Sequence, residues 1–276
     1  MTGATEEDIW DGSRGQRWVE AQKLTDRMFK PVEDLLAEEV AAEAPGALLD
    51  VGCGAGSTTL RASEAMSGKG SCVGLDISTP LVEAARARAE AAGAPVEFIR
   101  ADAETHDFAD RKFDLIISRF GVMFFESFIE GYVNLRRAAA PEGALCVITW
   151  REPQENPFMT AVGRAVRPLL PDLPSYDPDA PGQFGMADEG KIRRVIEGSR
   201  WKDLVYEPVD FECAFPASEI DMMLTHLGPI GTILPTLDPQ QAEKVFETAK
   251  DAYTPYIDGD EVKYTAACWK ITARND

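Results

Sequence analysis

The sequence is poor in basic residues and contains hardly any histidine. Its 276 residues include 28 lysines and arginines against 47 aspartates and glutamates, a formal net charge of -19, and only 2 histidines. A chain this acidic repels phosphate backbones and anionic lipid headgroups, and no lysine- or arginine-rich run forms a local basic patch. We therefore expect no nucleic acid and no membrane as partners, although the same charge also serves simply to keep the protein in solution.

Cysteines are few and scattered. The five are Cys53, Cys72, Cys146, Cys213 and Cys268. No Cys-x-x-Cys pair occurs and the number is odd, which argues for reduced thiols and against a disulfide framework or a zinc site. The first ten residues are polar and acidic, unlike a signal peptide, and no apolar run reaches the length of a membrane-spanning helix. These absences lead us to expect a cytoplasmic protein without a bound metal.

Short apolar runs alternate with helical patterns through the first half of the chain. Each strand-like run is followed by turn residues and a helical segment, the order typical of an α/β protein with a doubly wound parallel sheet. The predicted strands are 47–51, 71–75, 96–100, 113–118 and 144–150, and the predicted helices are 20–44, 57–66, 79–93 and 128–139.

This alternation ends after Trp150. Residues 151–190 are rich in proline, aspartate and glycine, and we interpret them as an insertion. A helix is expected at 191–198, followed by two strands, 204–215 and 262–272, that are able to pair in an antiparallel arrangement. A mostly helical segment, 218–256, separates these two strands.

The strongest motif follows the first predicted strand and reads Leu-Leu-Asp-Val-Gly-Cys-Gly-Ala-Gly over residues 48–56. Glycines at a strand-to-helix turn let the backbone approach a ligand closely, with the amide groups of the helix N-terminus pointing at it. A nicotinamide dehydrogenase would need a third glycine, or alanine, where this chain has Ser57. The loop therefore predicts a nucleoside-like ligand without supporting a dinucleotide.

Acidic residues stand at the carboxyl ends of three consecutive predicted strands. Asp50, Asp76 and Asp102 would share one edge of the sheet, which is where ligands bind in open α/β folds. Asp76 suits a bidentate hydrogen bond to ribose hydroxyls, and Asp102 can accept from the amine of an adenine. Asp50 would repel a pyrophosphate but attract a cation. S-adenosylmethionine has an adenosine, an ammonium, a sulfonium and no phosphate.

These motifs resemble those of class I S-adenosylmethionine-dependent methyltransferases, of the bacterial group related to the ubiquinone-biosynthesis enzymes. The resemblance is carried by the glycine loop and by segments 73–78, 101–103, 113–123 and 267–272. It implies that Asp76 holds the ribose, that Ile77 packs on the adenine, and that Ser118 and Arg119 lie beside the methionine part. The cofactor-binding residues expected in this way are Asp50, Gly52, Cys53, Gly54, Gly56, Asp76, Ile77, Asp102, Ala103, Ser118, Arg119 and Trp18.

The fold expected is a Rossmann-like, doubly wound, seven-stranded sheet with an N-terminal helical lid and an inserted helical cap. Trp10 and Trp18 belong either to a loop that folds over the cofactor or to a helical segment docked on the sheet, and both descriptions can hold. We divide the chain into a lid (1–45), a cofactor-binding core (46–150), a first cap insertion (151–190), a core helix and strand (191–215), a second cap insertion (216–258) and a final core strand (259–276).

Methyl transfer from a sulfonium is an in-line displacement, so the enzyme mainly positions the two reactants and excludes water. The expected substrate is a small, partly apolar, hydroxylated molecule such as a phenol, quinone or polyketide, methylated on oxygen or carbon. The candidate substrate-binding residues are Met123, Phe124, Trp150 and Phe158. Single aromatic residues are more often part of a core than of a pocket.

His226 is the candidate catalytic base, because it lies in the second insertion and can accept a proton from a weakly acidic substrate. The alternative is a hydrogen-bonded structural histidine of the cap. A second hypothesis for the whole protein retains the fold and the cofactor but assigns a non-methylating enzyme or a ligand-binding protein. The sequence leaves the methyl acceptor undefined and a homodimer open.

Overall fold

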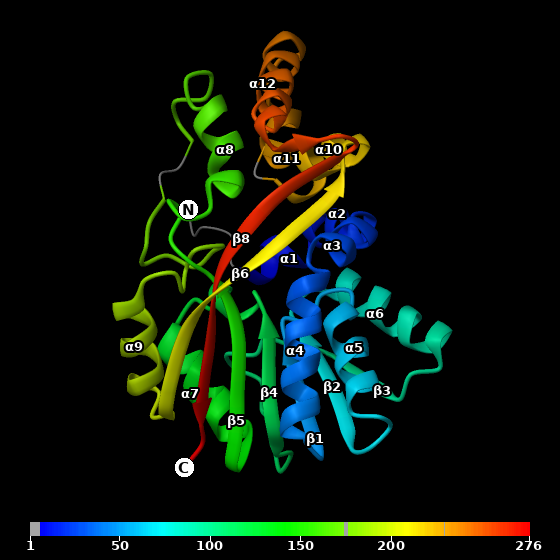
Figure 1. The fold of residues 1–276 in the computed structure, drawn as a ribbon, viewed down its shortest axis with the longest axis vertical. Helices are drawn as coiled ribbons and strands as arrows, with labels where there is room; N and C mark the ends of the chain where they lie inside the picture. The colour runs from blue at the N-terminus through cyan, green and yellow to red at the C-terminus, as the bar shows by residue number, and fades with distance from the viewer. Residues whose placement is uncertain (1–5, 174–175, 229) are drawn as a thin grey trace.

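The computed structural model describes residues 6–173, 176–228 and 230–276. Residues 1–5 of the expected lid, 174–175 of the first insertion and Pro229 of the second lie outside this part. In the described chain one mixed sheet has the order β3-β2-β1-β4-β5-β8-β6, with the short β7 paired to β8 (Figure 1). The strands are β1 (Ala47–Val51), β2 (Ser71–Asp76), β3 (Val96–Arg100), β4 (Phe113–Arg119), β5 (Ala139–Trp150), β6 (Lys202–Pro216), β7 (Ile257–Asp258) and β8 (Glu261–Arg274).

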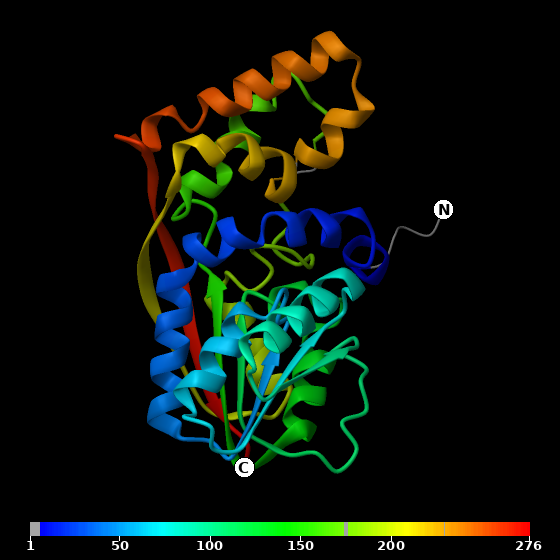
Figure 2. The same cartoon turned by 90° about the vertical axis from the view of Figure 1, so that its right-hand side faces the viewer.

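Helices cover both faces of this sheet. Helices α4 (Lys30–Glu43), α5 (Ser57–Ala65) and α6 (Thr79–Ala92) lie on one face, and α7 (Phe128–Ala138) and α9 (Glu189–Gly198) on the other (Figures 1 and 2). Strands β1 and β4 are almost completely buried, as expected of parallel strands with helices on both sides. The Rossmann-like α/β sheet predicted from the sequence is confirmed, with β7 as an addition to the seven expected strands.

One predicted turn lies inside an assigned strand. The sequence indicates a helix to residue 139, a turn at 141–143 and a strand from residue 144, whereas α7 ends at Ala138 and β5 begins at Ala139. The amide of Glu142 donates to the carbonyl of Asn275 (2.7 Å), and the amide of Asn275 donates to the carbonyl of Gly143 (2.9 Å). Glu142 has a φ of 61°, and the pairing of β4 with β5 is irregular between Ala139 and Ala144, so the Pro-Glu-Gly segment turns locally while these long-range bonds tie it to the C-terminus.

Strands β6 and β8 are 15 and 14 residues long, and they pair antiparallel as predicted. Their lower halves belong to the sheet, and their upper halves continue beyond β5 as a two-stranded ribbon that carries the cap (Figure 1). The cap is mostly helical, as the sequence indicates. It contains α8 (Pro157–Val166), η2 (Ala217–Glu219), α10 (Ile220–Met222), the π-helical turn η3 (Met223–Leu227), α11 (Ile230–Ile233), η4 (Leu234–Thr236), α12 (Pro239–Asp251) and η5 (Thr254–Tyr256).

The N-terminal segment is helical, as one of the two descriptions of Trp10 and Trp18 requires. Helices α1 (Glu6–Trp10), α2 (Ser13–Glu20) and α3 (Gln22–Met28) cross the space between the upper edge of the sheet and the cap (Figure 2). This upper edge is formed by the carboxyl ends of the parallel strands. A short 3-10 turn, η1 (Val122–Phe124), follows β4 at the same edge. Any ligand at the glycine loop therefore has the lid and the cap above it.

Candidate functional site

The glycine loop joins β1 to α5 and is tied to the end of β2. The amide of Gly54 donates to Oδ2 of Asp76 (2.8 Å), and the amide of Ser78 donates to Oδ1 of the same carboxylate (2.9 Å). Gly52, Gly54 and Gly56 all have positive φ values of 69°, 54° and 83°, a region that residues with a Cβ rarely adopt. The loop conformation therefore depends on glycine, and it fixes the position of the Asp76 carboxylate.

Asp76 is 8% exposed, so it lies at the boundary between the core and the upper edge. Burial raises its pKa, while the hydrogen bonds from the backbone amides act in the opposite direction. The amide of Ile77 also acts on this carboxylate, and a carboxylate has about four acceptor positions, so capacity for a further hydrogen bond remains. This is the chemistry required of a group that accepts from two neighbouring hydroxyls.

Asp50 lies deeper, beneath the glycine loop. It is 1% exposed, and Oγ1 of Thr59 donates to its Oδ2 (2.7 Å). Its Oδ1 is buried and has no hydrogen-bond partner among the described residues. Burial raises the pKa of Asp50 to about 7, and the carboxyls of Asp76 and Glu33 act in the same direction. An unsatisfied buried carboxylate oxygen costs free energy, which a cationic or hydrogen-donating ligand would recover.

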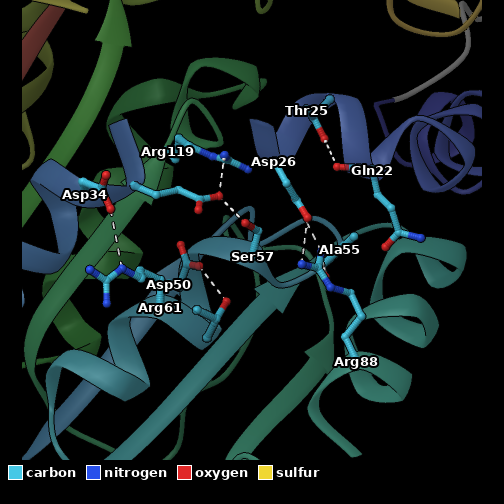
Figure 3. A network of polar contacts seen from close by, with 12 residues as sticks. Gln22, Thr25, Asp26, Asp34, Asp50, Ala55, Ser57, Arg61, Arg88 and Arg119 are labelled. Atoms are coloured by element: carbon cyan, nitrogen blue, oxygen red, sulfur yellow. Dashed lines mark hydrogen bonds and ion pairs between the residues drawn. The ribbon is translucent and has the colours of Figure 1, made fainter. Parts of the chain in front are cut away.

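Glu33 of α4 is a site residue that the sequence analysis missed. Oε1 of Glu33 accepts from Nη1 of Arg119 (2.9 Å) and from the hydroxyl of Ser57 at the start of α5 (Figure 3). Burial raises the pKa of Glu33, and the charge of Arg119 acts against this shift. A sequence signal existed: Glu33 shares the buried face of α4 with Ala37 and Val40, at the helical spacing of four and seven residues.

The site thus holds three buried carboxyl groups near one another, those of Glu33, Asp50 and Asp76. Arg119 is the cation paired with Glu33. Among the described residues, no side-chain cation contacts Asp50 or Asp76, and the pKa of each of the three acids is raised. The residues present fit a ligand that carries positive charge and has hydroxyl donors, and they do not fit a phosphate. S-adenosylmethionine meets both requirements.

The residues expected around the adenine form a second loop at the same edge. Asp102 accepts from the amide of Glu104 (2.9 Å) and from the hydroxyl of Thr105 (3.0 Å), so its carboxylate shapes its own turn. Ala103 is buried and Ile77 half-buried. Glu104 accepts from the amides of Glu126 and Ser127 (2.6 and 2.8 Å), which ties this loop to the segment after η1. The loop is pre-formed, and the contact of its residues with a base remains a prediction.

The lid is anchored beside Asp76. Oδ1 of Asp11 accepts from the amide of Thr79 at the start of α6 (2.6 Å). Gly15 lies so close to the β2–α6 turn that a Cβ on it would be 2.4 Å from Oγ of Ser78. Trp18 packs edge-to-face on Trp10 with ring centroids 5.5 Å apart, and Trp10 packs in the same way on Phe124. Helices α1 and α2 therefore pack against the upper edge of the sheet. Their closure over a cofactor remains a prediction.

Three of the predicted site residues, in β4, the glycine loop and η1, are buried in this conformation. Ser118 is fully buried, and its hydroxyl donates to the carbonyl of Val51 (2.7 Å) and accepts from the amide of Gly121 (3.1 Å), which joins β4 to the glycine loop. Cys53 is buried in the loop with its pKa raised well above the usual value by burial. Met123 is 1% exposed. None of these three presents a free polar surface.

Aromatic rings gather beside Arg119. Phe120 has a φ of 65°, rare for a residue with a large side chain, and its ring stacks on Trp150 with centroids 4.8 Å apart. Phe29 of the lid contacts both rings edge-to-face, at 5.3 and 6.1 Å. Strained residues of this kind cluster at functional sites. Trp150 and Phe29 are buried, at 2% and 5% exposure, so the group is an aromatic cluster next to the charged site in which Phe120 is the half-buried member, and contact of Trp150 with a substrate remains a prediction.

Phe158 lies instead in the core of the cap. It is 1% exposed and stacks between Tyr264 and Tyr253, with ring centroids at 3.9 and 4.8 Å. Both faces of its ring are occupied by aromatic packing. This arrangement favours a structural role for Phe158 over the predicted contact with a substrate.

His226 joins the cap to the lid. Its Nε2 is 3.0 Å from a carboxylate oxygen of Glu20 in α2, and its Nδ1 is 2.8 Å from the hydroxyl of Thr225. A carboxylate is an acceptor, so Nε2 carries a proton and donates it to Glu20. Nδ1 is occupied by Thr225. Neither nitrogen is available to take a proton from a substrate in this conformation, so the base hypothesis for His226 remains a prediction and the structural alternative gains support.

The five cysteines are all buried and unpaired. Within residues 6–173, 176–228 and 230–276, no group of three or more histidine, cysteine or acidic side chains is arranged to hold a metal ion. Over the same residues, no helix combines the length and apolarity needed to cross a membrane.

Comparison with known proteins agrees with this geometry. Residues 48–143 match the methyltransferase domain family. A demethylmenaquinone methyltransferase of Thermus thermophilus is 35% identical over 123 residues, which are 44% of this chain and 56% of that protein. An aklanonic acid methyltransferase of Streptomyces sp. is 36% identical over 78 residues, 28% of this chain and 36% of that protein. The chain thus spans little more than half the length of the first relative and about a third of the length of the second.

A solved structure shares the fold over the whole chain. The (4+2)-cyclase SpnF has a TM-score of 0.58 at 17% identity, and the match covers 100% of this chain and 97% of that one. Residues 48–143 are thus similar to a methyltransferase domain, which supports the resemblance to class I S-adenosylmethionine-dependent methyltransferases that the sequence motifs indicate.

Proposed function

We propose that this protein transfers a methyl group from S-adenosylmethionine to an oxygen or carbon atom of a small, partly apolar, hydroxylated acceptor such as a phenol, quinone or polyketide. The observation that carries the proposal is the buried carboxyl group of Asp50, which has an unpartnered oxygen directly under a glycine loop. Asp76 stands at the same edge with hydrogen-bonding capacity to spare. This combination favours a ligand that is both a nucleoside and a cation.

The roles of the residues follow from their contacts. Asp76, held by the amides of Gly54 and Ser78, would accept hydrogen bonds from the ribose hydroxyls. Asp50 and Glu33 would face the positive charge of the methionine part. When bound, S-adenosylmethionine supplies an electrophilic methyl group on sulfur. The protein positions the acceptor in line with it, and the lid helices exclude water that would weaken the electrostatic contacts.

The acceptor class is supported by the aromatic cluster of Phe29, Phe120 and Trp150 beside Arg119, of which Phe120 is the half-buried member. Flat rings of this kind suit a planar, partly apolar molecule. The demethylmenaquinone methyltransferase among the relatives is named for a quinone substrate, which supports the same class.

The test is a product assay with the full-length protein. It is incubated with S-adenosylmethionine and a panel of phenols, quinones and polyketides, and mass spectrometry follows both S-adenosylhomocysteine and any product heavier by one CH₂ group. We expect equal amounts of the two from at least one acceptor. Asp76→Ala serves as the matched control, because it should abolish both signals together.

A second candidate function is a reaction other than methyl transfer on the same fold. It is favoured by one observation: the structure that covers this whole chain is named as a (4+2)-cyclase. In that case acceptors would be rearranged without the appearance of S-adenosylhomocysteine. A product of unchanged mass, formed while S-adenosylmethionine stays intact, would contradict the methyltransferase proposal.

A further inference from the structure

We propose that Glu33 and Arg119 form the subsite for the amino-acid end of the cofactor, with Glu33 receiving its ammonium group and Arg119 its carboxylate. The inference rests on the proposed function and extends it, because it makes α4, a helix outside the matched methyltransferase domain, part of the cofactor site. In the ligand-free geometry the two side chains neutralise each other. A bound zwitterion would replace one ion pair by two.

The placement of the pair supports this role. Glu33 projects from α4 to the start of α5, and Arg119 comes from the last position of β4, so both lie at the upper edge of the sheet. Their side chains are 9% and 15% exposed, and Nη1 of Arg119 is 2.9 Å from Oε1 of Glu33. In Figure 3, Arg119, Ser57 and Asp50 lie together at the turn between β1 and α5. The pair is therefore adjacent to the glycine loop that would hold the rest of the cofactor.

A second observation points to a ligand at this place. Oδ1 of Asp50 is buried without a partner, and Asp50 senses the charges of both Arg119 and Glu33. The cluster therefore places the carboxyl groups of Glu33 and Asp50 beside a single cation, Arg119. A buried ion pair is by itself poor stabilisation, because the loss of hydration offsets most of the attraction. An additional ammonium group between Glu33 and Asp50 would satisfy the unpartnered oxygen and correct the charge.

Arg119 is suited to the other half of the zwitterion. Its guanidinium has five N–H donors in a planar fork that matches a carboxylate, and Nη1 engages Glu33. The guanidinium also lies over the ring of Phe29, at 5.6 Å from the centroid, which fixes its plane. The remaining N–H groups can therefore meet a ligand carboxylate without a large change in the side chain.

Attachment of the lid alone does not require this pair. A different ion pair already joins the same segment to the core: Nη2 of Arg88 is 2.8 Å from Oδ2 of Asp26, and Nη1 of Arg88 donates to the carbonyl of Ala55. These side chains are 28% and 29% exposed, so this pair anchors the lid at the rim of the site. Asp26 is therefore a matched control for Glu33, since it comes from the same N-terminal segment and also pairs with an arginine.

The experiment compares two ligands by calorimetry: S-adenosylhomocysteine, and 5′-methylthioadenosine, which has the same nucleoside and thioether but no amino-acid end. The variants are Glu33→Gln, Arg119→Gln and Asp26→Asn, each checked for folding by circular dichroism and melting temperature. We expect Glu33→Gln and Arg119→Gln each to weaken S-adenosylhomocysteine by about 10–100-fold. Their affinity for 5′-methylthioadenosine should be unchanged, and Asp26→Asn should alter both ligands equally.

Each outcome has a definite meaning. If Glu33→Gln keeps the wild-type ratio of the two affinities, the subsite assignment is wrong while the proposed function stands. If Glu33→Gln and Asp26→Asn each weaken the affinity for both ligands equally, Glu33 only anchors the lid. This result also overturns the assignment. Failure of the wild-type protein to bind either nucleoside would overturn the proposed function itself.

Discussion

Gly52 and Gly121 touch each other through their backbones. A Cβ placed on Gly52 would lie 2.6 Å from Cα of Gly121, and one placed on Gly121 would lie 2.8 Å from Cα of Gly52. The first glycine begins the cofactor loop after β1, and the second follows β4 and precedes the turn η1. The loop that would hold the cofactor and the segment that would face the acceptor are therefore in direct contact.

This contact predicts the effect of Gly121→Ala. Gly121 has a φ of -75° and a ψ of -43°, which alanine adopts easily, so the change acts through steric overlap alone. We expect a loss of about 1–3 kcal/mol in the free energy of unfolding, together with weaker binding of S-adenosylhomocysteine. Chemical denaturation and calorimetry measure the two effects. Gly163→Ala in α8 is the control, since a Cβ there meets nothing within 4 Å; equal stability of both variants would contradict the prediction.

Asp76→Asn should weaken the binding of S-adenosylmethionine and S-adenosylhomocysteine by about 10–100-fold, because a charge-assisted hydrogen bond to hydroxyl groups is lost. The measurement is calorimetry on the folded variant. Asp107→Asn is a matched control, since Asp107 makes the same bond to the amide two residues later (2.8 Å) in an exposed turn. Undiminished affinity in Asp76→Asn would remove Asp76 from the site.

The carboxyl group of Asp50 predicts a dependence of stability on pH. Its pKa is about 7 in the folded protein, against 3.8 as its usual value, so the folded state binds the proton more firmly than the unfolded state. Stability is therefore present at low pH and is lost as the pH rises from about 4 through about 7. Asn at position 50 retains a side-chain oxygen that accepts the hydrogen bond from Thr59, and it does not titrate. Asp50→Asn therefore removes this loss of stability at higher pH.

The melting temperature of Asp50→Asn, measured without ligand, should accordingly rise relative to wild type between pH 5 and pH 8. The acids Glu33 and Asp76 remain in both proteins and interact with Asp50, so the comparison measures Asp50 together with its coupling to them. A difference between the two proteins that stays constant across this range would show that Asp50 is already ionised at low pH.

Gly15→Ala should displace the lid without unfolding the core. The new methyl group would lie 2.2 Å from the carbonyl oxygen of Trp10 and 2.4 Å from Oγ of Ser78, both in packed surroundings. We expect altered fluorescence of Trp10 and Trp18, faster proteolysis within α1 and α2, and reduced turnover with an unchanged sheet. Native kinetics in a variant with a displaced lid would show that closure is not required for activity.

Glu20 and His226 should behave as one unit that holds the lid to the cap. In a double-mutant cycle, Glu20→Gln and His226→Gln should each raise the susceptibility of α2 to proteolysis, and the double variant should be no worse than either single one. Single-turnover rates across pH 6 to 9 address the other hypothesis. A rate loss of about 10²–10⁴-fold in His226→Gln, absent from Glu20→Gln and shrinking as pH rises, would establish His226 as a base.

The core of this fold was predictable because its signals are local. The apolar run 47–51, the glycine loop and the acid at position 76 lie within a short stretch of sequence, and a parallel sheet brings the ends of its strands to one edge without further information. The boundaries that failed depend on distant partners. Residues 141–143 have the composition of a turn and, at Glu142, its backbone conformation, and their hydrogen bonds with the distant Asn275 include them in β5.

The site was predictable only in part for the same reason. The motifs predicted that Asp50, Asp76 and Arg119 lie at the upper edge of the sheet, where the structure has them. Glu33 lies beside Arg119 although 86 residues separate the two in the sequence. The contact of His226 with Glu20 spans 206 residues. No spacing rule covers such distances. The buried helix face at Glu33 was the available signal, and it indicates burial without naming the partner.

The junction between the cap and the ribbon has a consequence for how such proteins diversify. Pro216 and Glu261 are directly opposite each other in register, and the amide of Ala217 donates to the carbonyl of Asp260 (2.8 Å). Residues 217–260 therefore begin and end at neighbouring points of the ribbon formed by β6 and β8. A tight reverse turn would connect the two strands there equally well. A segment bounded in this way can be lengthened, shortened or replaced wholesale while the strand register stays fixed. This part of the cap can thus change over evolution independently of the sheet that bears the glycine loop.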